Sequence, residues 1–509
     1  MNPRRCPCGR VVFAVLLLAT LPLAGWAQLI CSTNNGAIII TRYNGGAVSV
    51  IIPATTNGYP VTSIGVRAFS GQDRLASVTI PDSVTNIGND AFLNCSCLTN
   101  LMFGNGVISI GNEAFENCLD MGNVTIPDSV SSIGNDAFGF CGGLTNVMIG
   151  SGVTSLGDTA FERCANLTNI AVKAANSNYA SANGVLFNKT LTTLVQYPGG
   201  LTGSYTIPNG VTDIVSSAFW FCPKLTSVTI PNSLTSIRTY QFESCYYLTN
   251  VTIGNGVMSI GDYAFYNCSI ASVRIPDRVT NLGNYSFYEC YNLRSVTIGS
   301  GVTNIGYDAF FSCSRLTNVV FPDSVINIGI GAFYGCSGLT SVKFGNSINS
   351  ISDQSFEYSG LTSVTIPTNI TNMGYRSFGL CPDLHQAYFQ GNAPSVGGGP
   401  GSADNLLFGG ESGTVYYLPG TSGWDSTFGG WPTAVWLPQI QRAGNSGQSA
   451  NGFCFNINWA GNQTVVVEAA TNLQNWIPVI TNTLVNGTNF FSDSEYTNFS
   501  KRFYRVRSQ

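Results

Sequence analysis

The sequence is poor in charged residues. Only 9% of its 509 residues are Asp, Glu, Lys or Arg, and the formal net charge is −4. An average soluble domain carries about 25% charged residues. No run of like charges occurs, so we expect no electrostatic capture of nucleic acid or of an anionic membrane. The polar surface must come from Asn, Thr, Ser and Gly, which favours neutral partners.

Histidine is almost absent, since His385 is the single one in the chain. A Ser-His-Asp or Cys-His catalytic arrangement would have to use it, and a His-based zinc site needs more than one such ligand. The glycine-rich stretches lack the strand-to-helix context of a phosphate-binding loop. We therefore expect neither an enzyme nor a bound cofactor or metal.

Long apolar runs are confined to the amino terminus. Arg4, Arg5 and Arg10 precede the run from Val11 to Ala24, and Gly25-Trp26-Ala27 places small residues at positions −3 and −1 of a cleavage site. Residues 1–27 are therefore predicted to be a signal peptide. No later stretch reaches the ~18 to 20 apolar residues that a spanning helix needs. The mature chain is expected to be secreted or held at the cell surface, without a membrane-spanning segment.

A repeat dominates the rest of the chain. Its anchors are Phe69, Phe92, Phe115, Phe138, Phe161, Phe219, Phe242, Phe265, Phe287, Phe310, Phe333, Phe356 and Phe378. The steps are 22 or 23 residues, except for 58 between Phe161 and Phe219. A fixed period of this size indicates a stacked architecture. Cysteines follow the same period, as in Cys95, Cys118 and Cys141, so they are expected to be buried thiols of the repeat rather than a disulfide framework.

One repeat, residues 225–245, shows how a rung is built. Val228 and Ile230 alternate with Ser and Thr, which is typical of a half-buried strand. Pro231 then turns the chain, and Ile237 and Phe242 are expected to point inward. A single rung cannot bury its apolar face, but stacked rungs share a continuous core. The sequence therefore predicts a mainly β solenoid of about 13 rungs of 22–23 residues.

The residue after the first strand alternates between Pro and Gly, as in Pro81, Gly104, Pro127 and Gly150, which indicates duplication of a two-rung unit. Asp follows several of these prolines, at Asp82, Asp128, Asp277 and Asp323. We expect each carboxylate to bond its own backbone in a turn. The alternative, a calcium site, is disfavoured because residues two rungs apart are about 10 Å from each other.

The remaining segments give a domain plan. Residues 28–60 are expected to cap the solenoid, which spans residues 61–438 and includes a hairpin insertion near 174–203 and a closing rung at its carboxyl end. A Gly/Ser/Asn-rich linker is expected over residues 439–451. Five short predicted strands in residues 452–509 favour a small β-sandwich of fibronectin-like or immunoglobulin-like character.

The repeat resembles a known family. The pattern LTSVTIP-x-SVTSIG-x-x-AF-x-x-C, seen in residues 225–245 and 248–268, is similar to the BspA-type leucine-rich repeat of bacterial surface proteins. The resemblance covers roughly Val61 to Cys381. It implies a secreted or cell-surface protein, in a family in which some members bind host or matrix proteins. It carries no shared catalytic residues.

Aromatic residues recur beside the anchor in the later rungs. They directly follow it at Trp220, Tyr266, Tyr288, Phe311 and Tyr334, and they stand two residues before it at Tyr240, Tyr263 and Tyr285. Stacking is expected to bring them into two columns. These columns are the candidate ligand surface of a secreted or cell-surface binding or adhesion protein that recognises an extracellular protein or glycan. Alternatively, the rings only stiffen the wall of a cell-envelope or matrix spacer without a specific ligand.

Overall fold

The computed structural model describes residues 28–397, 406–409, 412–441, 447–449 and 452–509; the predicted signal peptide lies outside these ranges. The described residues form strands, turns and a 3-10 turn, η3 (Tyr496–Asn498), without an α-helix, so the mainly β class is confirmed. None of their segments is a helix long and apolar enough to cross a membrane. The chain divides into two compact units, Met1–Val302 with Ala309–Ser314 and Thr303–Asp308 with Arg315–Gln509.

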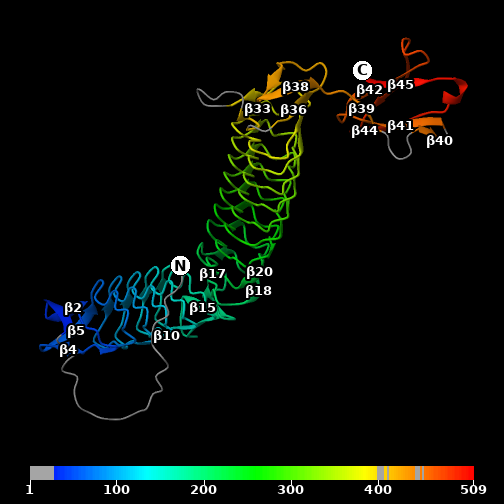
Figure 1. Ribbon diagram of the computed structural model, residues 1–509. Coiled ribbons are helices and arrows are strands. Elements are labelled where there is room, and N and C mark those ends of the chain that lie inside the picture. Colours follow the sequence, from blue (N-terminus) through cyan, green and yellow to red (C-terminus); the bar gives the residue numbers. More distant parts are fainter. Residues whose placement is uncertain (1–27, 398–405, 410–411, 442–446, 450–451) are drawn as a thin grey trace. The chain divides into compact units, whose positions relative to one another are not determined.

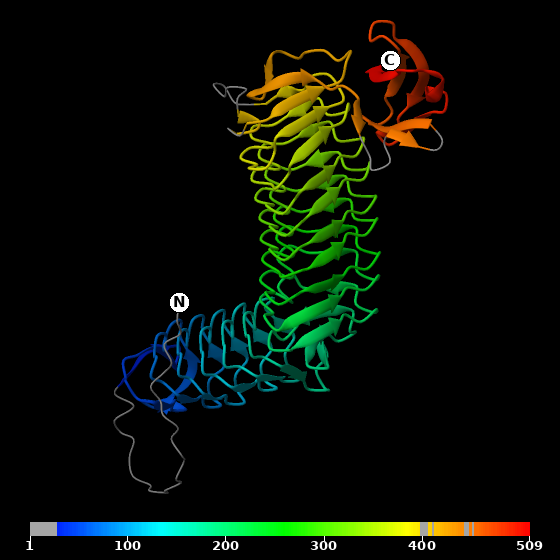
Figure 2. The ribbon, with the colours of Figure 1, turned by 45° about the vertical axis from the view of Figure 1, so that its right-hand side comes forward.

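Each rung contributes two parallel strands that pair with their copies in the neighbouring rungs (Figures 1 and 2). The register repeats the sequence period, so that Val124 lies opposite Val147 and Ser132 lies opposite Ser155. Along the first strand, side chains alternate between the core and the surface because successive residues of a strand point to opposite faces. The solenoid predicted from the period is thus confirmed.

In the first unit, the first strands of the rungs are β6 (Ser77–Thr79), β8 (Asn100–Met102), β10 (Asn123–Thr125), β12 (Asn146–Ile149), β14 (Asn169–Val172), β18 (Gly203–Thr206), β20 (Leu225–Thr229), β22 (Asn250–Thr252), β24 (Ser272–Arg274) and β26 (Ser295–Thr297). The second strands are β7 (Asn86–Ile87), β9 (Ser109–Ile110), β11 (Ser132–Ile133), β13 (Ser155–Leu156), β19 (Asp213–Ile214), β21 (Ser236–Ile237), β23 (Ser259–Ile260) and β25 (Asn281–Leu282).

In the second unit, the first strands are β28 (Asn318–Val320), β30 (Ser341–Lys343), β32 (Ser363–Ile366), β34 (Gln386–Phe389), β36 (Thr414–Tyr417) and β38 (Trp431–Val435). The second strands are β27 (Asn304–Ile305), β29 (Asn327–Ile328), β31 (Ser350–Ile351), β33 (Asn372–Met373) and β35 (Ser395–Val396). A short strand, β37 (Thr427–Phe428), pairs antiparallel with β38 at the carboxyl end of this ladder.

The amino-terminal end of the ladder is closed by five strands, β1 (Leu29–Asn34), β2 (Ala37–Tyr43), β3 (Ser49–Ile51), β4 (Thr55–Thr56) and β5 (Tyr59–Ile64). Strand β2 pairs parallel with β5, and β3 pairs parallel with β6, so both already have the rung arrangement. Strand β1 pairs antiparallel with β2 and covers its outer edge. Covering this edge removes a row of unpaired backbone groups that would otherwise invite aggregation.

A ladder of stacked phenylalanine rings forms the centre of the core. The ring centroids of Phe69 and Phe92 lie 4.8 Å apart, and those of Phe92 and Phe115 lie 5.0 Å apart. Each anchor is almost fully buried. The Phe92 N–H donates to the carbonyl oxygen of Ala114, the residue before the next anchor. Packing and hydrogen bonding therefore repeat together from rung to rung.

The solenoid has about 16 turns, and the expected number of about 13 was too low. Tyr43 and Tyr197 occupy the anchor position, because each stacks on the next anchor and donates its backbone N–H to the residue before that anchor. Buried Phe408 follows Leu407, whose carbonyl oxygen accepts the Phe378 N–H in the same way. A search for phenylalanine at a fixed spacing misses all three.

The insertion forms three antiparallel strands, β15 (Tyr179–Ala182), β16 (Val185–Asn188) and β17 (Thr193–Gln196). Strand β17 pairs parallel with β19, so it also serves as the second strand of a rung whose anchor is Tyr197. The guanidinium group of Arg163, from the last rung before the insertion, lies 5.0 Å from the ring of Trp220, in the first rung after it. This contact joins the two runs of rungs across the inserted strands.

The ladder cysteines are buried thiols. Each thiol for which the bond is seen points at the backbone of the preceding rung: the Cys95 Sγ lies 3.2 Å from the carbonyl oxygen of Phe69, and the Cys268 Sγ lies 3.1 Å from that of Phe242. Burial raises the pKa of Cys95 and Cys290 to about 12. These thiols therefore stay protonated at neutral pH, act as weak donors and are poor nucleophiles.

We predict that the ladder thiols remain reduced in the purified protein. In a parallel ladder all side chains at one position point the same way, which misaligns the sulfurs for a disulfide. The measurement is a thiol count after denaturation without reductant, with native protein as the control. The native protein should react slowly because the thiols are buried. Finding most ladder cysteines already oxidised would contradict the prediction.

The alternation of Pro and Gly has a steric and hydrogen-bonding cause. The Asp82 carboxylate accepts the backbone N–H of Asn105 in the next rung, at 2.7 Å, so the expectation that this Asp bonds its own backbone was wrong. Asp128 and Asp277 do the same to Ser151 and Ser300. A Cβ on Gly104 would lie 2.4 Å from the Pro81 carbonyl carbon. Every Pro-Asp turn therefore needs a glycine turn stacked on it.

The carboxyl-terminal strands form two antiparallel sheets. They are β39 (Gln439–Gln441), β40 (Gly447–Ser449), β41 (Gly452–Asn458), β42 (Thr464–Ala470), β43 (Ile477–Thr483), β44 (Thr488–Asp493) and β45 (Phe503–Ser508). Phe455, Ile457, Val465 and Val467 lie in their shared core. Two stretches of the expected linker are strands, because β39 and β40 both pair with β41.

Candidate functional site

The backbone near each anchor places two residues per rung in the left-handed region. One stands two residues before the anchor, as with Asp90 at φ 55°, and the other stands two residues after it, as with Asn94 at φ 61°. Asp and Asn tolerate this conformation, whereas bulky side chains rarely adopt it. Tyr240, Tyr263 and Tyr285 nevertheless occupy the first position, at φ 61°, 55° and 57°. Rare strain of this kind often marks a functional position.

The first aromatic column consists of these tyrosines and Trp220. The ring centroids of Tyr240 and Tyr263 lie 5.0 Å apart, and those of Tyr263 and Tyr285 lie 4.5 Å apart with an interplanar angle of 13°. Trp220 stacks on Tyr240 at 6.1 Å. The repeat period therefore places one ring directly over the next, as the sequence predicted.

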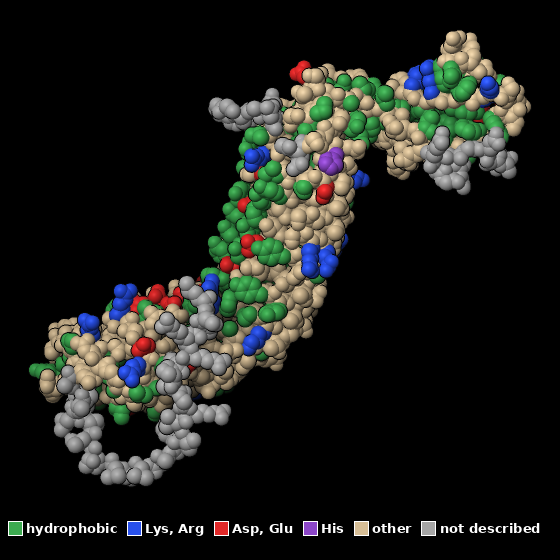
Figure 3. Space-filling view, in the orientation of Figure 1, with side chains coloured by type: hydrophobic (Ala, Val, Ile, Leu, Met, Phe, Trp, Pro, Cys, Tyr) green, Lys and Arg blue, Asp and Glu red, His purple; other side chains and the backbone are tan. Residues whose placement is uncertain are grey.

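The second column consists of Tyr266, Tyr288 and Phe311, with centroid distances of 5.3 Å and 4.5 Å. The two columns touch, because the Tyr263 and Tyr266 rings lie 5.8 Å apart at an angle of 56°. Seven of the eight predicted residues thus form one continuous surface of the first unit, which we call the aromatic face. Tyr334 lies in the second unit, edge-on to Tyr358 at 5.3 Å. Hydrophobic side chains are seen along one side of the later rungs (Figure 3).

In the earlier rungs the same positions carry carboxylates. Glu113 and Asp136 replace the tyrosines of the first column, and Glu116 and Glu162 replace the aromatic residues of the second. Burial, together with the like charges of neighbouring rungs, raises the pKa of Glu116 and of Glu162 to about 7. No group of three or more His, Cys, Asp or Glu among the described residues could hold a metal ion. These rungs present carboxylates where the later rungs present rings.

Three exposed tyrosines beside the aromatic face were not predicted. Tyr246 and Tyr247 follow Cys245, and Tyr291 follows Cys290. Their exposed fractions of 40%, 66% and 47% exceed those of most rings in the two columns. Burial raises the pKa of Tyr291 to about 12, as does the adjacent carboxylate of Glu289. The signal available in the sequence was the turn position directly after the repeating cysteine.

His385 is exposed, and its Nδ1 lies 3.1 Å from the carbonyl oxygen of Ser412. A carbonyl oxygen only accepts, so Nδ1 carries the proton in this bond. The structure places no Ser or Cys side chain in a printed hydrogen bond with this ring among the described residues. Nothing in this arrangement supports nucleophilic catalysis.

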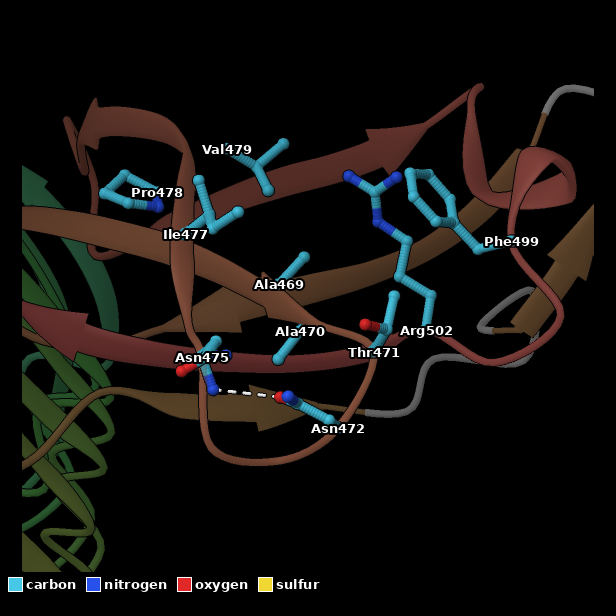
Figure 4. Close-up of a pocket in the computed structure, with 10 residues that line it drawn as sticks. All are labelled: Ala469, Ala470, Thr471, Asn472, Asn475, Ile477, Pro478, Val479, Phe499 and Arg502. Carbon is cyan, nitrogen blue, oxygen red and sulfur yellow. Dashed lines mark hydrogen bonds between the residues drawn. The ribbon is translucent and has the colours of Figure 1, made fainter.

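A cavity of about 400 Å³ lies in the carboxyl-terminal sheets, lined by Ile477, Val479, Phe499 and Arg502 among others (Figure 4). The Arg502 guanidinium lies over the Phe499 ring at 4.1 Å, and its Nε is 3.0 Å from the Asp493 carboxylate. Asp493 therefore neutralises the charge that would attract an anionic ligand.

The repeated parallel rungs, buried anchors and polar outer strand positions define a leucine-rich-repeat solenoid with a ring-bearing surface. The model of the BspA type leucine rich repeat region matches residues 62–190, 212–316 and 303–399, together more than half of the chain. The chain therefore belongs to the BspA-type leucine-rich repeat family. The match ends at residue 399, so the fibronectin-like or immunoglobulin-like character of the carboxyl-terminal sheets stays a prediction.

Solved structures agree on the fold. A leucine-rich repeat protein from Bacteroides ovatus is 27% identical, with a TM-score of 0.53, over 77% of this chain and 94% of its own. A leucine rich cell surface protein from Faecalibacterium prausnitzii is 24% identical, with a TM-score of 0.37, over 71% of this chain and 94% of its own. The pneumococcal vaccine antigen PcpA is 19% identical, with a TM-score of 0.42, over 76% and 91%. No curated protein sequence matches the chain.

Proposed function

We propose that this protein is a secreted or cell-surface binding or adhesion protein that recognises an extracellular protein or glycan through its aromatic face. The observation that carries the proposal is the run of seven rings on one unit, with three tyrosines held in the left-handed region. Half-exposed Tyr and Trp are enriched in binding interfaces, where they supply much of the contact energy. The signal-like residues 1–27 and the family support an extracellular location.

The ring geometry narrows how the face would bind. Each inner ring of a column has neighbours on both faces, as Tyr263 has between Tyr240 and Tyr285. The column therefore presents ring edges and phenol hydroxyl groups to a ligand. Flat stacking of a sugar on these inner rings is blocked, so a partner would contact edges and hydrogen-bond to the hydroxyl groups. Stacking also supports the alternative function, a structural spacer, because stacked rings brace successive rungs.

The double substitution Tyr263→Asn with Tyr285→Asn separates the two functions. Asn suits the left-handed backbone, so relief of roughly 1 to 3 kcal/mol of strain per site offsets a loss of about 0.5 to 1.5 kcal/mol per ring pair. We expect the melting temperature to change little and ligand binding to be lost. The measurements are a melting curve and a titration with a ligand found on a protein and glycan array.

The matched control is Glu113→Asn with Asp136→Asn, which makes the same residues at the same rung positions outside the aromatic face. Binding should be unchanged in this variant. A Tyr263→Asn, Tyr285→Asn protein that melts far lower, while its folded fraction binds normally, would assign the rings to bracing and contradict the proposed function.

A further inference from the structure

One rung beside the aromatic face has a shortened turn. Between Phe265 and Phe287 the step is 22 residues, and the missing residue falls after Cys268. Strand β24 begins four residues after Cys268, whereas β22 begins five residues after Cys245 and β26 five residues after Cys290. The two-residue turns at 246–247 and 291–292 have no counterpart after Cys268. The wall is therefore recessed at Ser269, and we call this recess the notch.

Tyrosines flank the notch on both sides. Tyr246 stands at the same turn position one rung before Ser269, and Tyr291 stands there one rung after it. Among the described residues, Tyr246 has one ring contact, edge-on with Phe221 at 5.7 Å, and Tyr291 has none. The small Ser269 thus interrupts a column that would otherwise stack, as the neighbouring columns do. Ring faces remain accessible here, in contrast to the inner rings of the aromatic face.

The surroundings of the notch are acidic. Tyr266, in the rung of Ser269, has its pKa raised first by burial and then by the carboxylates of Glu289 and Glu243 and by Tyr246. Glu289 also lies beside Tyr291. Tyr266 and Glu289 therefore lie near both flanking tyrosines. Exposed ring faces and a nearby carboxylate both favour positive charge, since the face of an aromatic ring is the negative part of its quadrupole.

Size agrees with charge. Tyr246 and Tyr291 are two rungs apart, about 10 Å at a strand spacing of ~4.8 Å. A cation midway between them lies about 5 Å from each ring, within the ~6 Å reach of a cation–π contact. From this geometry we infer that the notch binds an Arg or Lys side chain of a protein partner between Tyr246 and Tyr291, with Glu289 as the counter-ion. The inference rests on the proposed function and gives its partner a chemistry, that of a basic protein segment.

The test is a titration of the full chain with a hexa-arginine peptide and with the matching citrulline peptide, which has the same shape without the charge. We expect saturable binding of the arginine peptide and at least about tenfold weaker binding of the citrulline peptide, in line with the worth of a desolvated cation–π contact. Ser269→Tyr should remove binding, because the added ring completes the stack and fills the notch. Ser96→Tyr, the same change at the same turn position of a distant rung, should bind normally.

The opposite results overturn the inference. Equal binding of both peptides excludes recognition of charge, and unchanged binding by Ser269→Tyr excludes the notch. Loss of folding in Ser269→Tyr is covered by the Tyr246→Ser with Tyr291→Ser variant, which removes only exposed rings and should also lose binding. Binding of an array ligand by a chain that ignores the arginine peptide would reject the notch and leave the aromatic face standing. A glycan that binds and is displaced by Ser269→Tyr would assign the notch to a sugar instead.

Discussion

Phe242→Ala is expected to lower the free energy of unfolding by about 3 to 5 kcal/mol, the range for a buried Phe replaced by Ala. The Phe242 ring is fully buried and stacks on Phe219 at 4.8 Å and on Phe265 at 5.2 Å. Its loss leaves a cavity that two rungs share. The interior is close-packed, so neighbouring rungs cannot close the cavity without moving their own strands. Urea titration followed by circular dichroism gives the change.

Ser227→Ala is the control in the adjoining strand, because Ser227 is half-buried and lies on the outer side of β20 next to fully buried Val228. This substitution should change the free energy of unfolding by no more than about 0.5 kcal/mol. Equal unfolding midpoints for the two variants would mean that the inner and outer sides of the rung are assigned the wrong way round.

Gly256→Ala is expected to destabilise the protein by about 1 to 3 kcal/mol or more, as overpacking does in a tightly packed interior. A Cβ on Gly256 would lie 1.9 Å from the carbonyl oxygen of Asn232 and 2.9 Å from that of Leu234, both in the preceding rung. Both contacts are with backbone, so no side chain can move aside. The rungs must separate locally, which also weakens the bond from the Asn255 N–H to the Asn232 side chain.

Gly210→Ala is a closely matched control. Gly210 occupies the same position of its turn, but it follows the insertion, and a Cβ there meets nothing within 4 Å. Neither glycine has a positive φ. We expect Gly210→Ala to be neutral or to stabilise the chain by about 0.4 to 1 kcal/mol, through a less flexible unfolded state. A thermal melt of both variants measures the difference. Equal midpoints would show that contact between turns does not cause the Pro/Gly alternation.

The interior of the solenoid could be predicted from the sequence because side-chain burial follows a strict period. The period fixed which residues stack, and it placed seven of the eight candidate rings together. It could not identify Tyr43 and Tyr197 as anchors, because the position was kept while the residue type changed. The total of about 16 turns was underestimated for this reason.

Atomic contacts were harder to predict than positions. The period shows that Asp82 and Asn105 belong to successive turns, but not that the carboxylate reaches across to the next rung. The notch depends on a single missing residue after Cys268, which a pattern based on the anchor treats as ordinary variation. Strands β39 and β40 were not expected because their short polar sequences lack the alternation of apolar residues that indicates a strand.

The most direct test of the proposed function is a saturation experiment with the full chain on a combined protein and glycan array, run beside the Tyr263→Asn, Tyr285→Asn variant. We predict at least one ligand that binds saturably to the natural chain and does not bind to the variant, with equal melting temperatures for the two proteins. A natural chain that binds nothing saturably, or a variant that keeps every ligand, would contradict a binding function of the aromatic face and favour a structural spacer.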